Sequence, residues 1–390
     1  MKELRVGIVG AGNMGWAHLN CIYNREVAGL TVTAACDCDT VRLAEVGKAF
    51  PGLNLYEDYR ALLKDGKVDA LIVATPHPLH AEIGIAALAS GRHLLVEKPE
   101  DISVTKAEKL NETAKKSGRV FGIMFNQRTN TLFQQARGLV RGGELGGLKR
   151  TVWIITNWYR TQSYYDSGDW RATWGGEGGG VLLNQAPHNL DLWQWICSMP
   201  VAVSALCETA KYHNIEVEDE AILRTRYANG ANGIFITSTG EFPGTNRLEI
   251  SGTKGKIVIE DGLLKHWRLE TDEREVCKTG KDGFCSIPFE YKEYRSKGET
   301  AHKGILQNFT DAVLRGEELL APGFEGINEL TLSNAAYLSQ WLGGKEISLP
   351  FDASEFDRLL SEHASASKYR PKGAHSTREQ GYDPRWQVRW

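Results

Sequence analysis

The chain has 390 residues, which is enough for two domains and a large hydrophobic core. Its formal net charge is only −3, so the composition indicates neither a nucleic-acid-binding face nor a membrane-surface patch. We find no apolar run of about 18 residues, the length that a membrane span needs, and we expect no signal peptide. The seven cysteines are scattered and odd in number. They favour a reducing cytoplasm over a disulfide framework, and we expect no metal site.

Short apolar runs alternate with helix-like segments over the first 127 residues. We expect strands at 4–9, 31–36, 70–74, 93–97 and 120–124. We expect helices directly after Met14 and at 41–50, 59–64, 80–90 and 104–117. This alternation predicts an α/β domain with a parallel, doubly wound sheet, whose ligands bind at the carboxyl ends of the strands.

A glycine motif joins the first strand to the first helix. Gly10, Gly12 and Gly15 have the spacing G-x-G-x-x-G. In a dinucleotide site, Gly10 would allow the tight turn, Gly12 would let the backbone approach a pyrophosphate, and Gly15 would let the helix pack closely. The N–H groups at Asn13 and Met14 would face the phosphates. The alternative is a turn that is merely rich in glycine.

An acid follows the second expected strand. Asp37 stands where a dinucleotide site binds the adenosine ribose hydroxyls, and its charge would repel a 2′-phosphate. The next residue, Cys38, offers no cationic clamp, so NAD is favoured over NADP. Asp39 competes for the ribose position, and its alternative role is the N-cap of the following helix.

After about Gln127 the pattern changes to longer segments of period two. We expect a helix at 131–141 and strands at 148–158, 202–209, 220–227, 233–239, 247–251, 256–260 and 263–271. Helices at 189–197, 302–315 and 326–342 would cover one face of this antiparallel sheet. We therefore divide the chain into a dinucleotide domain (1–127), an α+β domain (128–364) and an extended tail (365–390).

Two features of this second part concern assembly. The open sheet face suggests burial against another subunit in a homodimer or homotetramer. The polar tail ends in Tyr382, Trp386 and Trp390, which leaves two options: a disordered tail, or one that packs on a neighbouring subunit.

Three further motifs follow the glycine motif in order: Ala74-Thr75-Pro76 with His80, Val96-Glu97-Lys98-Pro99, and the run from Gly178 to Asp191 that contains Asn184 and His188. With them, residues 4–350 resemble the Gfo/Idh/MocA family of NAD(P)-dependent oxidoreductases, which act mainly on sugars and cyclitols. The resemblance implies an N-terminal Rossmann domain and a C-terminal domain built on a large, mostly antiparallel sheet.

The resemblance also assigns catalytic roles. The lysine that matches Lys98 touches the nicotinamide ribose and the reacting hydroxyl, and its bond to the following proline is often cis. An ammonium there favours a developing alkoxide. His188 matches the proton acceptor or its relay, which suits a neutral imidazole. Asp191 shares a helical face with His188, so it orients the imidazole, binds a substrate hydroxyl or simply supplies charge at the helix start.

One residue departs from the family pattern. Many members carry aspartate where this chain has Asn184, and an amide can bond a hydroxyl but cannot take its proton. Substrate identity is therefore not carried over. The remaining positions that the resemblance places around the cofactor are Thr75, Pro76, His80, Glu97, Asn126 and Arg128. For His80, a polar residue at a helix start is the alternative.

An aromatic and polar segment at 153–174 is the expected substrate face. Trp153 alternates with its strand and is expected in the core. For the loop beyond it, a sugar pocket competes with ordinary core packing, and we favour the pocket. The expected substrate residues from this loop are Tyr159, Arg160, Tyr165, Trp170 and Arg171, together with Asn184 and Asp191.

These features predict a cytoplasmic NAD-dependent dehydrogenase of a ring secondary alcohol in a sugar, glycoside or cyclitol, with glycoside C3 as one option for the reacting carbon. Two alternatives stay open. One is a non-catalytic NAD-binding regulator with the same fold. The other is a sugar–sugar oxidoreductase that holds its cofactor tightly.

Overall fold

The computed structural model describes residues 3–168, 170–368, 381–383, 386–388 and 390. In this part of the chain the first sheet has six parallel strands in the order β3-β2-β1-β4-β5-β6. They are β1 (Leu4–Val9), β2 (Leu30–Cys36), β3 (Asn54–Tyr56), β4 (Ala70–Val73), β5 (His93–Val96) and β6 (Phe121–Ile123). This is the expected doubly wound sheet, and its strand order reverses between β1 and β4, where such sheets bind ligands.

Helices cover both faces of this first sheet. They are α1 (Asn13–Tyr23), α2 (Thr40–Ala49), α3 (Tyr59–Asp65), α4 (His80–Ala89) and α5 (Val104–Ser117), close to the predicted bounds. Asp39 caps α2, because its carboxylate accepts from the N–H groups of Val41 and Arg42. The strands are almost wholly apolar because both faces are covered.

The second sheet has the order β14-β13-β12-β11-β7-β10-β9-β8-β15 in the described residues. Its strands are β7 (Leu148–Ile155), β8 (Ala202–Thr209), β9 (Glu218–Arg226), β10 (Asn232–Ser238), β11 (Asn246–Gly252), β12 (Gly255–Glu260), β13 (Leu263–Leu269), β14 (Phe289–Arg295) and β15 (Ile347–Ser348). All neighbours pair antiparallel except β7 and β10, which pair parallel. The prediction of a mostly antiparallel sheet is confirmed.

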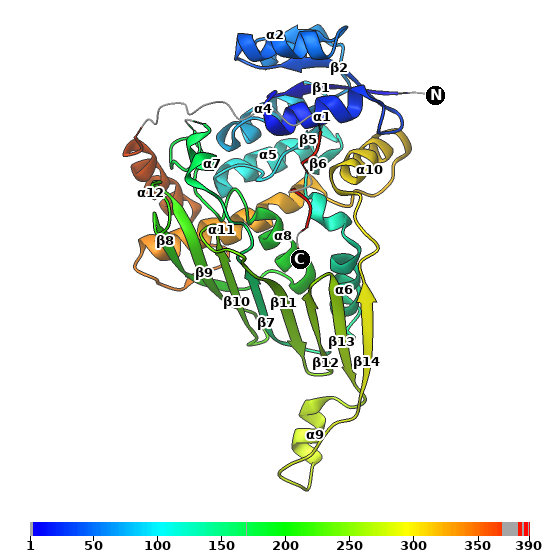
Figure 1. Cartoon of the computed structure of the whole chain (residues 1–390), viewed down its shortest axis with the longest axis vertical. Coiled ribbons are helices and arrows are strands. Elements are labelled where there is room, and N and C mark those ends of the chain that lie inside the picture. The colour runs from blue at the N-terminus through cyan, green and yellow to red at the C-terminus, as the bar shows by residue number, and fades with distance from the viewer. Residues whose placement is uncertain (1–2, 169, 369–380, 384–385, 389) are drawn as a thin grey trace.

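Three helices lie between the two sheets and cover one face of the second (Figure 1). They are α6 (Thr131–Arg141), α8 (Pro187–Cys197) and α11 (Gly326–Trp341). Trp153 of β7 is fully buried beneath them, as expected. The short helix α7 (Gln162–Asp166) stands in the loop that follows β7, and α12 (Ala353–Ser365) follows β15. The open face of the sheet leaves Leu206 and Ile222 exposed.

Helix α10 (Ala301–Arg315) corrects one prediction. We expected it to cover the second sheet. Instead Ile305, Leu306 and Phe309 join the hydrophobic core of the first sheet. The N-terminal core therefore recruits a helix from far along the chain, because the apolar stripe of α10 fits the side of that sheet beside β6 and the loop after it.

The chain between β13 and β14 forms an arm that projects from the body of the molecule (Figure 1). It carries α9 (Glu273–Thr279), in which no residue is buried. At the other end of the chain, residues 369–380, 384–385 and 389 of the expected extended tail lie outside the described residues. The described tail residues pack on this same chain, a third option beside disorder and packing on a neighbour.

Candidate active site

The glycine loop has the geometry that its spacing predicts. Gly10 has φ +91°, and a Cβ there would lie 2.6 Å from the carbonyl oxygen of Ala74. A Cβ on Gly15 would lie 1.8 Å from the carbonyl oxygen of Gly10, so only glycine lets α1 pack against the turn. A Cβ on Gly12 would meet only the Arg42 guanidinium at 3.7 Å, so this side of the loop is open. No side chain caps the N-terminus of α1 among the described residues, which leaves its N–H groups for an anion.

Asp37 lies directly beside this loop. Its Oδ2 accepts from the N–H of Ala11 at 2.7 Å, and its Oδ1 accepts from the N–H of Asp39 at 2.9 Å. The carboxylate is thereby fixed at the open side of the glycine loop. Asp39 instead caps α2, and Cys38 is exposed.

Orphaned polar atoms line the same edge of the first sheet. Thr75 follows β4, and its Oγ1 is buried without a hydrogen-bond partner in the described structure. Asn126 follows β6 and is fully buried, and neither atom of its amide has a partner there. Buried polar groups of this kind usually bind a ligand or an ordered water. With the open glycine loop and Asp37, they fit a dinucleotide that runs across the switch point between β1 and β4.

Lys98 stands just beyond β5, and its peptide bond to Pro99 is cis. Its Nζ donates to the main-chain oxygen of Asn184 at 2.6 Å. This bond brings the cation from the first sheet to the loop that leads into α8. Burial lowers the pKa of Lys98 below its usual value, and the charges of Glu97 and Glu177 oppose that shift.

His188 is the second residue of α8 and directly follows Pro187. Its Nδ1 is buried and has no hydrogen-bond partner in the described residues, and its ring meets Phe125 edge-on at 6.4 Å. Burial, reinforced by the charge of Lys98, holds the pKa of His188 well below its usual value. The imidazole is therefore neutral near pH 7 and able to accept a proton.

Asn184 is tied to an acid that sequence reasoning missed. Its Nδ2 donates to Oε1 of Glu177, and its Oδ1 accepts from the Tyr164 hydroxyl at 3.4 Å. The same hydroxyl accepts from Arg171 at 2.8 Å. Burial raises the pKa of Glu177. The one sequence signal for this residue is a lone charge inside the run Gly175-Gly176-Glu177-Gly178.

Two predicted site residues bind each other instead. Arg128 is fully buried and donates to both carboxylate oxygens of Asp191, at 2.8 and 2.6 Å. It also contacts Glu325 and the carbonyl oxygen of Leu320. Asp191 thus bonds Arg128 and Gln194, and in the described residues it makes no hydrogen bond with His188. The place of Arg128 beside the cofactor and that of Asp191 at the substrate stay predictions.

Two other expected cofactor residues, His80 and Glu97, bind protein groups behind the edge of the first sheet where its strands end. His80 is buried, with its Nδ1 2.7 Å from the Pro99 oxygen and its Nε2 2.8 Å from the Thr75 oxygen. It stands at the start of α4, as the alternative reading had it. Glu97 is buried and pairs through Oε1 with His18 Nε2 at 2.8 Å. Both therefore support the loops at this edge, and their assignment as cofactor contacts stays a prediction. Pro76 begins the turn into the 3₁₀ helix His77–Leu79.

The aromatic loop divides between pocket and core. Tyr165 belongs to the core and bonds Thr239 Oγ1 at 2.7 Å, so its place in a substrate pocket is corrected. Tyr159 is 45% exposed, and its ring meets that of the exposed Phe242 at 5.7 Å. The guanidinium of Arg171 lies over the rings of Trp170 and Tyr164, at 4.5 and 4.6 Å.

The guanidinium of Arg160 lies over the Tyr164 ring at 5.1 Å. Its Nη1 also donates to the carbonyl oxygens of Trp158 and Tyr159. Arg160, Trp170 and Arg171 thus gather around Tyr164, whose hydroxyl reaches Asn184.

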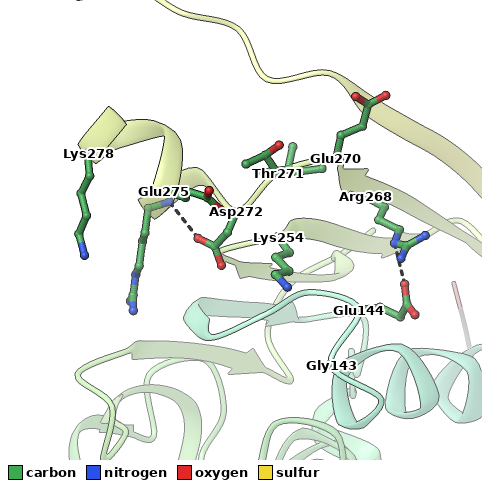
Figure 2. Close-up of a pocket in the computed structure, with 11 residues that line it drawn as sticks. Gly143, Glu144, Lys254, Arg268, Glu270, Thr271, Asp272, Glu275 and Lys278 are labelled. Carbon is green, nitrogen blue, oxygen red and sulfur yellow. Dashed lines mark hydrogen bonds and ion pairs between the residues drawn. The ribbon is translucent and has the colours of Figure 1, made fainter. Parts of the chain in front are cut away.

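A separate hollow of about 780 Å³ lies at the base of the arm (Figure 2). Its charges are mixed, and Arg268 is paired with Glu144 at 2.9 Å while Asp272 caps α9. In the described residues, this hollow does not bring together an acid, a base and a buried polar atom without a partner, as the carboxyl ends of the first sheet's strands do. We therefore locate the chemistry at the edge of the first sheet.

In the described residues no helix meets the length and apolarity of a membrane span, and no three metal-binding side chains cluster.

Two family models cover most of this architecture. Residues 4–125 match the oxidoreductase family with an NAD-binding Rossmann fold, and residues 133–258 match the GFO/IDH/MocA C-terminal domain. The chain belongs to the Gfo/Idh/MocA family. This oxidoreductase is thus an NAD-binding dehydrogenase by family, in line with the site described above.

This Gfo/Idh/MocA oxidoreductase is similar to several dehydrogenases. It is 25% identical to the myo-inositol 2-dehydrogenase of Thermotoga maritima over 85% of this chain and 95% of that protein. It is 27% identical to the levoglucosan dehydrogenase of Pseudarthrobacter phenanthrenivorans over 66% of this chain and 74% of that protein. The WlbA dehydrogenase of Bordetella pertussis, solved with NADH and UDP-GlcNAcA, superposes with a TM-score of 0.75 at 25% identity, covering 90% of this chain and all of that one.

Proposed function

We propose that this Gfo/Idh/MocA oxidoreductase oxidises a ring secondary alcohol of a sugar, glycoside or cyclitol, and that Lys98 and His188 act on the reacting hydroxyl. The observation that carries the proposal is the 2.6 Å bond from Lys98 Nζ to the Asn184 oxygen. This bond joins the cation that follows β5 to the loop residue four positions before His188 in the sequence, and His188 lies in the first turn of α8. A cation and a proton acceptor at one place suit the oxidation of an alcohol.

The cofactor is held by this chain's own groups. The glycine loop and the free N-terminus of α1 would receive the pyrophosphate, and Asp37 the adenosine ribose hydroxyls. Thr75 and Asn126 offer their orphaned polar atoms on the nicotinamide side. When bound there, NAD supplies the acceptor for the hydride that leaves the substrate carbon.

The proton is handled by two side chains. The ammonium of Lys98 lowers the pKa of a hydroxyl beside it and stabilises the alkoxide that develops as the carbon is oxidised. The neutral imidazole of His188 takes up the hydroxyl proton. Asn184 cannot take that proton, so its amide positions the ring instead, held by Tyr164 and Glu177.

The substrate face suits a ring with several hydroxyls. Trp170 and Tyr164 offer aromatic surface for the C–H face of a sugar, and Arg171 offers donors for its oxygens. The relatives named for inositol and levoglucosan support the same class. Within this class, oxidation at C3 of a glycoside is the specific reaction that we include in the test.

The test is NAD reduction at 340 nm with the purified full chain against a panel of cyclitols, free sugars and glycosides, with the oxidised carbon assigned by NMR. We expect turnover with at least one ring polyol and a ketone at a ring carbon. NAD binding without reduction of NAD by any member would contradict the proposal and favour a non-catalytic regulator. Cofactor that co-purifies and is reduced and reoxidised by two sugars in turn would point to a sugar–sugar oxidoreductase.

A further inference from the structure

The end of the C-terminal tail packs back onto the body of the chain. The main-chain N–H of Val388 donates to Glu299 Oε1 at 3.0 Å, and Trp390 packs against Phe133 of α6 at 5.6 Å. Trp386 meets His302 of α10 edge-on at 6.3 Å. These contacts hold the tail across both domains and place its one described tyrosine, Tyr382, at α1.

Tyr382 joins a buried cluster behind the cofactor edge. Its hydroxyl lies 2.7 Å from Nδ1 of His18, a fully buried residue of α1. Its ring stacks on His302, with the centroids 4.6 Å apart and the planes at 10°. The tail thus supplies both a hydrogen bond and a stacking surface to the interior of the molecule.

Hydrogen bonds connect this cluster to the main chain of Lys98. His18 Nε2 lies 2.8 Å from Oε1 of Glu97, and Oε2 of Glu97 accepts from the main-chain N–H of Lys98 at 3.3 Å. Burial raises the pKa of Glu97, but the hydrogen bond with His18 and nearby charges, that of Lys98 among them, outweigh burial and hold this pKa at about 2. Glu97 is therefore a carboxylate, and its charge raises the pKa of Lys98 against the effect of burial.

We propose that Tyr382 is a positioning residue for Lys98 that acts through His18 and Glu97. The proposal rests on the role of Lys98 given above. Nε2 of His18 faces the Glu97 carboxylate, which can only accept, and we infer that the Tyr382 hydroxyl donates to Nδ1 and so keeps the proton of the imidazole on Nε2. Without the hydroxyl, Nδ1 is a buried polar atom with no partner. The imidazole then turns away to find another partner, and Glu97 loses the hydrogen bond that keeps it ionised beside Lys98.

Other titratable groups surround the contacts that run from Tyr382 to Lys98. They are the same in the wild type and in the variants compared below. Those around His18 and Tyr382 are Cys21 and Glu26 near α1 and His302 of α10. Those around Lys98 are His77, Tyr164, Glu177, His188 and Glu329.

The experiment removes one oxygen atom from the tail. We compare the wild type with Tyr382→Phe and with Tyr227→Phe, a control that removes a buried tyrosine hydroxyl just after β9. The titration of Lys98 is followed by NMR after ¹³C-methylation of the lysines, with the signal assigned by Lys98→Arg.

We expect Tyr382→Phe to lower the pKa of Lys98 by about one unit, which is a tenfold change in its proton affinity. We also expect kcat to fall about tenfold while the Kd for NAD stays within about twofold, since positioning supplies part of what a proton-transfer group contributes. Tyr227→Phe should change neither.

An unchanged Lys98 titration in a folded Tyr382→Phe protein would overturn the proposal. If that variant does not fold, the ¹⁵N signals of His18 in the wild type decide: a proton on Nε2 alone is expected, and a proton on Nδ1 alone would overturn it. The titration needs no substrate. A shift in Lys98 without turnover by any polyol would therefore refute the proposed function and leave the link from Tyr382 standing, and turnover without a shift would do the reverse.

Discussion

Arg128→Met tests whether the buried ion pair with Asp191 supports the fold or serves the cofactor. Both side chains are almost fully buried, and the guanidinium donates to both carboxylate oxygens. The variant keeps the volume of the side chain but leaves the Asp191 carboxylate with Gln194 as its remaining side-chain donor, at 3.0 Å. Removing one partner of a buried ion pair costs about 3–5 kcal/mol. We expect a loss of stability of this size, because a methionine of similar volume adds little cavity cost.

Urea unfolding followed by tryptophan fluorescence gives the change in the free energy of unfolding, and titration with NAD gives the Kd. The matched control is Arg137→Met, because Arg137 lies over the ring of Trp195 at 4.6 Å, as Arg128 does at 5.1 Å, but is exposed. Losing an exposed cation–π contact should cost about 0.5–1 kcal/mol. A variant Arg128→Met as stable as the wild type, with NAD binding weakened tenfold or more, would refute our reasoning and place Arg128 at the cofactor site.

Three further outcomes follow from the site. Asp37→Ala should lower the preference for NAD over NADP about tenfold or more, because a hydrogen bond to a charged group contributes about 1.5–3 kcal/mol; an unchanged ratio of kcat/KM values would show that the acid is not on the ribose. Burial holds the pKa of His188 well below its usual value, so the imidazole gains a proton only in more acidic solution. The acid limb of kcat/KM should therefore lie below about pH 6.5, the unperturbed histidine value, and a limb above pH 7 that disappears in His188→Gln would contradict this. Glu177→Gln should lower kcat about tenfold with little change in KM, since the charge of Glu177 supports the ammonium form of Lys98; a wild-type kcat would remove Glu177 from the account.

Much of the fold follows from local pattern. Five strands of the first sheet, β1, β2, β4, β5 and β6, are predicted well because both of their faces are covered, so most of their residues are apolar. Strand β3 has only three residues and no apolar run, and β14 is almost wholly exposed and charged, so neither stands out in the sequence. The apolar stripe of α10 predicts a helix but does not say which sheet it covers.

The candidate site, like the fold, can be predicted from the sequence only in part. The glycine loop, Lys98 and His188 stand in motifs whose spacing reflects chemistry. The partners that hold other residues lie far along the chain. Arg128 and Asp191 are 63 residues apart, and His18 and Tyr382 are 364 apart. Composition and periodicity describe each residue's own segment, so these pairs become visible only once the tertiary structure brings the segments together.

We propose that Lys98 acts on the substrate hydroxyl and is not needed to bind NAD. The direct test is Lys98→Met, with kcat measured on the best substrate of the polyol panel and the Kd for NAD measured by titration on the same preparation. We predict a fall in kcat of about 100-fold or more, with the Kd for NAD within about threefold of the wild type. Turnover at the wild-type rate, or a loss of activity that is explained by lost NAD binding, would contradict the account.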